Sequence, residues 1–184
     1  MRVLGIDPSL TGTGLALIDL DQRAVVDTWT LATKGKADAT LRQRLARIDT
    51  ITHDATVLDD VTLVVIEGPS LGQTRQSGTF DRAGLWWSIV GKFAEYDIPV
   101  VEVAPACRAR YATGKGNAAK DTVLLEVARR YPHVPVANNN EADALVLAAM
   151  GLHHLTGEPL VNLPQAHTAA LAAVTWPTST GRAA

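Results

Sequence analysis

The chain has 184 residues, of which 47% are hydrophobic and 20% charged, and its formal net charge is −2. This length suits one globular domain, and the mildly acidic balance argues against a protein that binds nucleic acid through an overall basic surface. The single cysteine, Cys107, excludes an intramolecular disulfide and a thiolate-rich zinc site. Without a signal peptide or an apolar run of roughly 18 residues, we expect a cytoplasmic protein that does not associate with membranes.

The chain begins with three predicted strands, at residues 2–7, 14–19 and 24–31. Their connections, PSLTGTG and DLDQR, are short, which favours antiparallel pairing. A helix is predicted over about 39–58, because apolar residues recur there at helical spacing.

The remainder alternates between strands and helices. VTLVVIEGP and IPVVEVAP read as strands, and helices are predicted over 81–96, 118–131 and NNNEADALVLAAMGLHHL. This order predicts an α/β fold with a mixed five-stranded sheet, three antiparallel strands followed by parallel strands, flanked by helices. We expect one domain over 1–156, followed by a partly disordered C-terminal extension over 157–184 with one short helix near 165–173.

Acidic residues stand where elements begin or end. Asp7 closes the first strand and Glu67 closes LVVIE, so the two meet if these strands are parallel neighbours; Glu141 and Asp143 open the last long helix. Clustered carboxylates raise one another's pKa unless cations neutralise them, and oxygen ligands alone favour Mg²⁺ or Mn²⁺. A pair of such ions is a common device for phosphodiester hydrolysis.

Each acid also has a purely structural interpretation. Asp7 suits a turn, and Asn140 with Asp143 has the spacing of a helix cap followed by an acid in the first turn. Glu67 is harder to explain in this way, because an ionised residue at the end of a doubly buried strand needs compensation. Together, the acids in this element order favour a metal site.

These segments resemble the RuvC-like resolvases of the ribonuclease H-like superfamily, metal-dependent nucleases that cut branched DNA such as Holliday junctions. GIDPSLTGTGLALID, LVVIEGP and EADALVLA are similar to the segments with the catalytic acids, here Asp7, Glu67 and Asp143, and GNAAKDTV is similar to the segment whose lysine, here Lys120, approaches the scissile phosphate. The resemblance covers about residues 1–155. It implies a ribonuclease H-like nuclease domain, two Mg²⁺ ions for which Mn²⁺ may substitute, and a product with a 5′-phosphate.

The sequence departs from the family pattern at one ligand position. The family usually has an acid three residues before the last aspartate, where this chain has Asn140, and Glu141 follows one residue later. In an ideal helix Asn140 and Asp143 are about 60° apart, whereas Glu141 and Asp143 are nearly opposite. Two alternatives therefore remain: Asn140 ligates through its carbonyl oxygen, or Glu141 reaches the metal from an irregular first turn.

Two further surfaces are predicted. Arg108, Arg110, Lys115 and Lys120 lie in a stretch without acids, and together with Arg75, from the loop after Glu67, they are candidates for contact with DNA phosphates. Trp86 and Trp87 are adjacent on a helix and cannot share one face, so an exposed Trp there indicates a subunit interface. A homodimer suits a two-fold junction.

The interpretation that these features favour is a metal-dependent endonuclease of Holliday junctions, typical of a compact phage-type member of the family and acting in a bacterial cell or a phage-infected host. Its rivals are a nuclease of the same fold acting on flaps, forks or RNA, and a branched-DNA binding module without catalysis. RVLGIDPSLTGTG also resembles the phosphate-binding opening of actin-like ATPases and sugar kinases, but those proteins need two such domains, so no nucleotide cofactor is expected.

Overall fold

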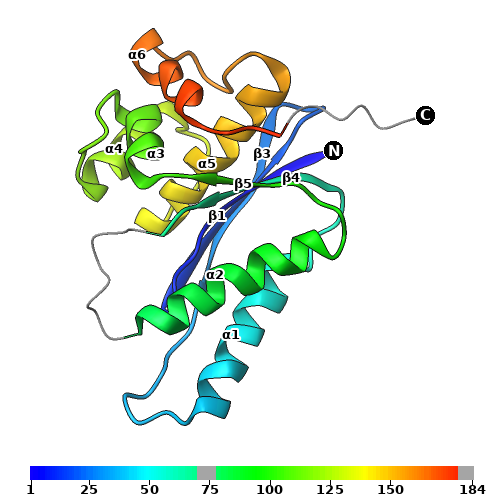
Figure 1. The fold of residues 1–184 in the computed structure, drawn as a ribbon. Coiled ribbons are helices and arrows are strands. Elements are labelled where there is room, and N and C mark those ends of the chain that lie inside the picture. Colours follow the sequence, from blue (N-terminus) through cyan, green and yellow to red (C-terminus); the bar gives the residue numbers. More distant parts are fainter. Residues whose placement is uncertain (70–77, 178–184) are drawn as a thin grey trace.

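The structure is a computed structural model that describes residues 1–69 and 78–177 (Figure 1). Its core is a five-stranded mixed sheet in the order β3-β2-β1-β4-β5. The first three strands pair antiparallel, whereas β4 is parallel to β1 and β5 is parallel to β4. The strands are β1 (Arg2–Asp7), β2 (Gly12–Asp19), β3 (Ala24–Ala32), β4 (Val61–Glu67) and β5 (Val100–Val103). This topology confirms the predicted mixed α/β sheet.

Helices cover both faces of the sheet (Figure 1). One face carries α1 (Leu41–Thr56) and α2 (Thr79–Ala94), and the other carries α3 (Pro105–Thr113), α4 (Lys120–Arg130) and α5 (Asn139–Thr156). Two hydrophobic cores result from the alternation of side chains along the strands. On β1, for example, Val3 packs with the α5 layer, while Leu4 and Ile6 pack with α1 and α2.

Two glycines let α5 lie very close to the sheet. A Cβ atom on Gly5 of β1 would overlap the carbonyl oxygen of Ala144, and one on Gly14 of β2 would overlap the carbonyl oxygen of Asn140. Glycine is the residue that permits such an approach of a helix backbone to a strand. The first turns of α5 are thereby held against the end of β1, where Asp7 lies.

Helix α3 is the element that the apolar pattern does not predict. Its nine residues begin with Pro105 at the first helical position, and the helix is followed by Gly114 with φ of 79°. Proline at the start and left-handed glycine after the end are the signals that mark such a short helix. Residues 106–113 of the basic stretch are therefore helical, and the direction of each side chain is set by the helix.

The described part of the C-terminal extension packs against α3. Helix α6 (Gln165–Thr168) and a short 3₁₀ helix (Ala169–Ala173) lie where one short helix is predicted. The Cys107 thiol donates to the carbonyl oxygen of Ala170, 3.0 Å away, and the ring of Trp176 stacks on His154. Within the described ranges, the helices are too short or too polar to cross a membrane.

Candidate active site

Asp7 and Glu67 lie side by side at the carboxyl ends of β1 and β4. Ile6 and Ile66 are register partners in the parallel pair, and each acid is the next residue along its strand. Asp7 is 7% exposed. The indole Nε1 of Trp86 donates to the Glu67 carbonyl oxygen at 3.0 Å, which fixes the end of β4. The structure therefore brings together the two strand-end acids that the sequence predicts.

Asp143 joins them from α5. Its side chain is 1% exposed, and its two oxygens have different surroundings. Oδ1 accepts from Arg108 at 2.5 Å, whereas the buried Oδ2 accepts no hydrogen bond from the residues that the structure describes. The Lys120 ammonium lies 4.0 Å from Oδ2.

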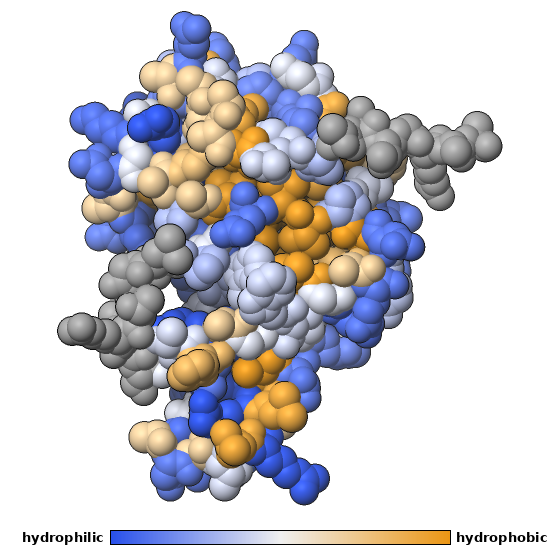
Figure 2. All heavy atoms as spheres, viewed as in Figure 1, coloured by the Kyte–Doolittle hydropathy of each residue, from blue (hydrophilic) through white to orange (hydrophobic). Residues whose placement is uncertain are grey.

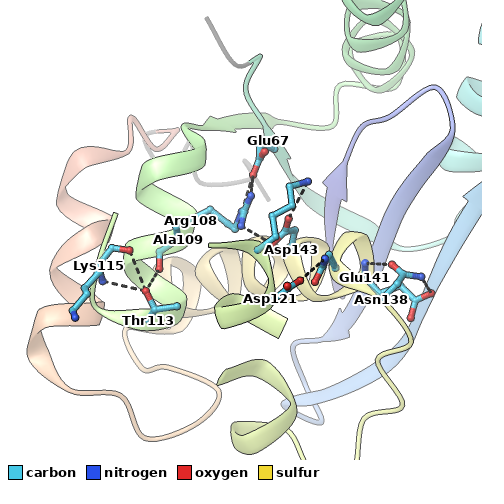
Figure 3. A network of polar contacts seen from close by, with 11 residues as sticks. Glu67, Arg108, Ala109, Thr113, Lys115, Asp121, Asn138, Glu141 and Asp143 are labelled. Atoms are coloured by element: carbon cyan, nitrogen blue, oxygen red, sulfur yellow. Dashed lines mark hydrogen bonds and ion pairs between the residues drawn. The ribbon is translucent and has the colours of Figure 1, made fainter. Parts of the chain in front are cut away.

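Arg108 bridges Glu67 and Asp143 (Figure 3). Its Nε and one terminal nitrogen both lie 2.7 Å from Oε2 of Glu67, and the other terminal nitrogen contacts Asp143. The residue is 4% exposed. Helix α3 directs this guanidinium inward, onto the acids, and contact of Arg108 with DNA phosphates stays a prediction.

Burial and mutual repulsion shift the titration of the acids. Desolvation, together with the charges of Glu67 and Asp143, raises the pKa of Asp7 to about 7. Burial is also the main cause that raises the pKa of Asp143 to about 6, against the opposing influence of Arg108. The cluster thus holds more negative charge than the nearby cations compensate, and this excess falls mainly on Asp7.

The donor set fits a hard divalent cation in its chemistry. Asp7, Glu67 and Asp143 supply only oxygen atoms, and Oδ2 of Asp143 is a buried acceptor with no donor in the described part of the chain. As they stand, however, no three acidic, His or Cys side chains in the described ranges are gathered closely enough to hold an ion. The guanidinium of Arg108 occupies two of the three carboxylates instead.

Glu141 is held in a network of hydrogen bonds at the start of α5. Its carboxylate accepts from Thr30 Oγ1 at 2.8 Å and from the backbone N–H of Ala137 at 2.7 Å. The Asn138 amide also donates to it, while Asn138 caps α5 by accepting from the Glu141 backbone N–H at 3.1 Å (Figure 3). These hydrogen bonds fasten the start of α5 to β3, and the role of Glu141 as a catalytic residue and metal ligand stays a prediction.

Asn140 stays a candidate ligand. It lies one turn before Asp143 on α5, and its amide nitrogen lies 2.9 Å from where a Cβ of Gly12 would be, beside the turn that follows Asp7. The neighbouring Asn139 instead donates to Asp121 of α4, at 3.3 Å. Of the alternatives that the sequence leaves open, only the side chain of Asn140 is free of the β3 network that holds Glu141.

The other predicted cations within the described residues lie at the surface. The side chain of Lys120, at the start of α4, is 62% exposed, and Arg110 and Lys115 are exposed near the end of α3. Thr113 accepts from the backbone N–H of Lys115, which orders the loop between the helices. Arg75 lies outside the described residues.

An apolar surface lies on the opposite layer, over α1 and α2 (Figure 2). Phe80 is 89% exposed and Trp87 is 67% exposed, and their neighbours on α1, Leu41 and Leu45, are exposed as well. Trp86, by contrast, packs with the core of this layer. The two adjacent tryptophans therefore divide between core and surface, as their spacing predicts.

Comparisons with known proteins agree on one family. No family model matches the chain. The RuvC crossover junction endodeoxyribonuclease of Chlamydia caviae is 33% identical over 158 residues, which cover 82% of this chain and 92% of the relative, and that of Synechococcus is 28% identical over 166 residues, covering 82% and 98%. The structure of Thermus thermophilus RuvC in complex with a Holliday junction substrate superposes with a TM-score of 0.64 at 20% identity, over 85% of this chain and 96% of that one.

Proposed function

Because the chain belongs to the family of RuvC crossover junction endodeoxyribonucleases, we propose that Asp7, Glu67 and Asp143 form the site at which this endonuclease hydrolyses branched DNA. The observation that carries the proposal is the convergence of two buried carboxylates and one partly buried carboxylate, from β1, α5 and β4, at one edge of the sheet. Each comes from a segment that matches a family motif. The substrate class is a four-way junction, as the names of the relatives indicate.

The metal in this proposal is Mg²⁺, with Mn²⁺ as a substitute, and two ions occupy each site. The three carboxylates would hold them, and Asn140 would complete the ligand set through its side-chain oxygen. When bound, such ions supply Lewis acidity at the scissile phosphate. Lys120 is placed to contact that phosphate, because its exposed side chain approaches Asp143 from the solvent side.

The DNA backbone would lie against the exposed cations of the α3–α4 region. Arg110, Lys115 and Lys120 carry no ion pair there within the described residues, apart from the 4.0 Å approach of Lys120 to Asp143. Contacts of this kind position a duplex without reading its sequence. We therefore expect binding that depends on branch structure and on salt concentration more than on base sequence.

A homodimer is the proposed assembly, formed through the apolar surface of Leu41, Leu45, Phe80 and Trp87. Exposed aromatic side chains on neighbouring helices are typical of a subunit interface. Two sites related by a two-fold axis suit paired incision of a symmetric junction. Sedimentation of the Phe80→Glu and Trp87→Glu variants, against the wild type, tests this directly: the wild type should be a dimer and both variants monomers.

The experiment that tests the function is incubation of the protein with a synthetic four-way junction, and with a linear duplex of the same sequence, in Mg²⁺ and in EDTA. We expect the protein to cleave the junction and not the linear duplex, and to do so in Mg²⁺ and not in EDTA. The Asp143→Asn variant should lose this cleavage. Binding without cleavage under every metal condition would instead identify a branched-DNA binding module. Full activity in EDTA would exclude the metal mechanism.

A further inference from the structure

Arg108 is a buried cation inside the acidic cluster, and two carboxylates engage its guanidinium. Three of its nitrogens contact two carboxylates, at 2.5 to 2.7 Å, and the residue is 4% exposed. A guanidinium that is held bidentately and out of water makes strong, directional contacts. Arg108 of α3 thereby links Glu67 to Asp143, and one oxygen of each carboxylate accepts hydrogen bonds from it.

A divalent ion would be held by the same two carboxylates. Arg108 contacts Oε2 of Glu67 and Oδ1 of Asp143, and Oδ2 of Asp143 is buried without a hydrogen-bond donor among the described residues. A metal ion and this guanidinium therefore compete for one pair of carboxylates. Because like charges repel at such short range, both cannot keep their full contacts at once.

We propose that Arg108 is an internal counter-ion that must leave the carboxylates before divalent ions bind, and that a DNA phosphate is the partner that draws it away. This inference rests on the proposed function. Arginine binds phosphate in the same bidentate manner as it binds carboxylate. Arg108 also lies on the helix whose exposed end carries Arg110 and leads to Lys115. Metal and DNA then bind with positive coupling, since each favours the released arginine.

The test measures metal affinity without any cleavage. Mn²⁺ binding to the full chain is followed by electron paramagnetic resonance, first without DNA and then with a four-way junction whose cutting positions carry a non-hydrolysable, methylene-bridged phosphonate. For the wild type we expect weak binding without DNA and at least about tenfold tighter binding with it, a coupling of about 1.4 kcal/mol. For Arg108→Met we expect tight binding without DNA and little further gain.

Arg129→Met is the matched control, because Arg129 is an exposed arginine of α4 whose partner is Glu126. It removes the same charge from the chain and should leave Mn²⁺ affinity at the wild-type value. Arg108→Lys should fall between the wild type and Arg108→Met, since an ammonium cannot bridge two carboxylates as a guanidinium does.

Loss of Arg108 also leaves two buried carboxylates unpaired, so Arg108→Met is expected to unfold at a lower temperature in EDTA. Mn²⁺ should then raise its melting temperature by more than it raises that of the wild type; if the variant is unfolded in EDTA, Mn²⁺ should restore its circular dichroism. An unchanged Mn²⁺ affinity, or no restoration, would overturn the competition. A wild type that shows the coupling but cuts no branched DNA would overturn the proposed function and leave the counter-ion role intact.

A second and independent feature is a basic groove of about 600 Å³ on the α1–α2 layer. The loop between β3 and α1, the first turns of α1 and the start of α2 form it, and Leu10, three residues after Asp7, lines one side. Its cations are Lys34, Lys36, Arg44 and Arg47.

Two of these four cations support the groove, and two are available to a ligand. Arg47 donates to Thr33 Oγ1 at 2.9 Å and to the Leu10 carbonyl oxygen, and Arg44 is paired with Asp81. Lys34 and Lys36 are exposed and form no ion pair with the residues that the structure describes. The loop that carries them is thus anchored by Arg47 while its lysines face the solvent.

We infer that this groove binds the phosphodiester backbone of a duplex arm that leaves the active site. This inference also rests on the proposed function, because the groove begins at the turn that follows Asp7. Ammonium groups on an anchored loop attract phosphate without reading sequence.

The test is junction binding in EDTA across a range of salt concentrations, with the Lys34→Ala/Lys36→Ala double variant. The slope of log affinity against log salt should flatten by about two units. Lys92→Ala is the control, since Lys92 lies at the far end of α2 in an ion pair with Glu95, and it should leave the slope unchanged. An unchanged slope in the double variant overturns this groove as a DNA site, whereas a wild type that binds no DNA overturns the proposed function itself.

Discussion

Glu141 and Asp143 are two buried acids that lie two residues apart on α5, and their surroundings are opposite in kind. Glu141 is surrounded by neutral donors: a threonine hydroxyl, a backbone N–H and an asparagine amide. Asp143 is bound by a buried arginine through one oxygen, and no donor from residues 1–69 or 78–177 reaches the other. The carboxylate of Glu141 thus belongs to a network of neutral hydrogen bonds. Asp143 belongs to a charged cluster in which its Oδ2 accepts no hydrogen bond from the described residues.

The difference teaches where chemistry is available on this helix. A carboxylate whose oxygens are all bonded to the fold has little left to offer a ligand, and moving it would leave Thr30 and Ala137 without partners. A carboxylate with an unbonded buried oxygen is in an unfavourable state that a cation would relieve. The helix phase decides between them, because residues two apart point to nearly opposite sides.

The largest expected effect separates the two acids by activity. Asp143→Asn should lower junction cleavage by at least about 10³-fold, because it removes a charge that the metal site requires. Glu141→Gln keeps the shape and one acceptor of the capping network, so it should lower cleavage by less than about tenfold. Single-turnover cleavage rates at saturating Mg²⁺ give both values, and a loss of equal size in the two variants would break the comparison.

The next effect separates them by stability. Glu141→Ala removes the acceptor of three donors at the start of α5, and we expect it to lower the free energy of unfolding by about 2 kcal/mol. Thr30→Val removes one of those donors and should cost about 1 kcal/mol. Urea unfolding in EDTA measures both. A Glu141→Ala variant as stable as the wild type would mean that the network does not fasten α5 to β3.

Much of this fold could be predicted from the sequence, for reasons that are local. The strands and long helices are marked by periods of two and 3.6 in apolar residues, and the strand-end positions of Asp7 and Glu67 follow from where those runs stop. Helix α3 has only weak apolar periodicity, so its signals are the flanking Pro105 and Gly114 alone. They are visible in the sequence and permit a helix without requiring one.

The burial of Arg108 could not be predicted in the same way. Its partners Glu67 and Asp143 are 41 and 35 residues away along the chain, and no local pattern distinguishes it from the exposed Arg110 two residues later. The role of Glu141 depends likewise on Thr30, which is 111 residues away. Contacts between segments that are distant in the sequence determine the burial and the partners of these side chains. The apolar periodicity of a single sequence does not reveal such contacts.

A smaller effect concerns the unequal charge of the two regions. The pKa of Asp7 is raised to about 7, so the folded state favours its protonated form, and the stability that this gives below the unfolded pKa is lost as pH rises through about 7. Asp7→Asn has no such loss. At pH 8 in EDTA it should be more stable than the wild type, with the difference becoming small near pH 4.

Thermal melts at pH 4, 6 and 8 follow this difference. Asp143→Asn should gain less than Asp7→Asn at pH 8, because it leaves one side of the buried Arg108 without its carboxylate. If Asp7→Asn unfolds more easily than the wild type at every pH, then Asp7 is a turn residue and its assignment to the metal site is wrong.

The smallest expected effect concerns Asn140, which directly precedes Glu141 and lies on the same face of α5 as Asp143. A metal site with Asn140 in place of a carboxylate carries one negative charge fewer, and this lowers its affinity for a divalent ion. Asn140→Asp should therefore bind Mn²⁺ about three- to tenfold more tightly and melt at a lower temperature in EDTA, since it adds charge to a crowded cluster. The control is Asn139→Asp, whose side chain faces Asp121 and not the cluster; it should leave Mn²⁺ affinity unchanged. Equal Mn²⁺ affinity in Asn140→Asp and the wild type would show that Asn140 is no ligand. A carboxylate at a ligand position adds a negative charge next to the ion and must therefore change its affinity.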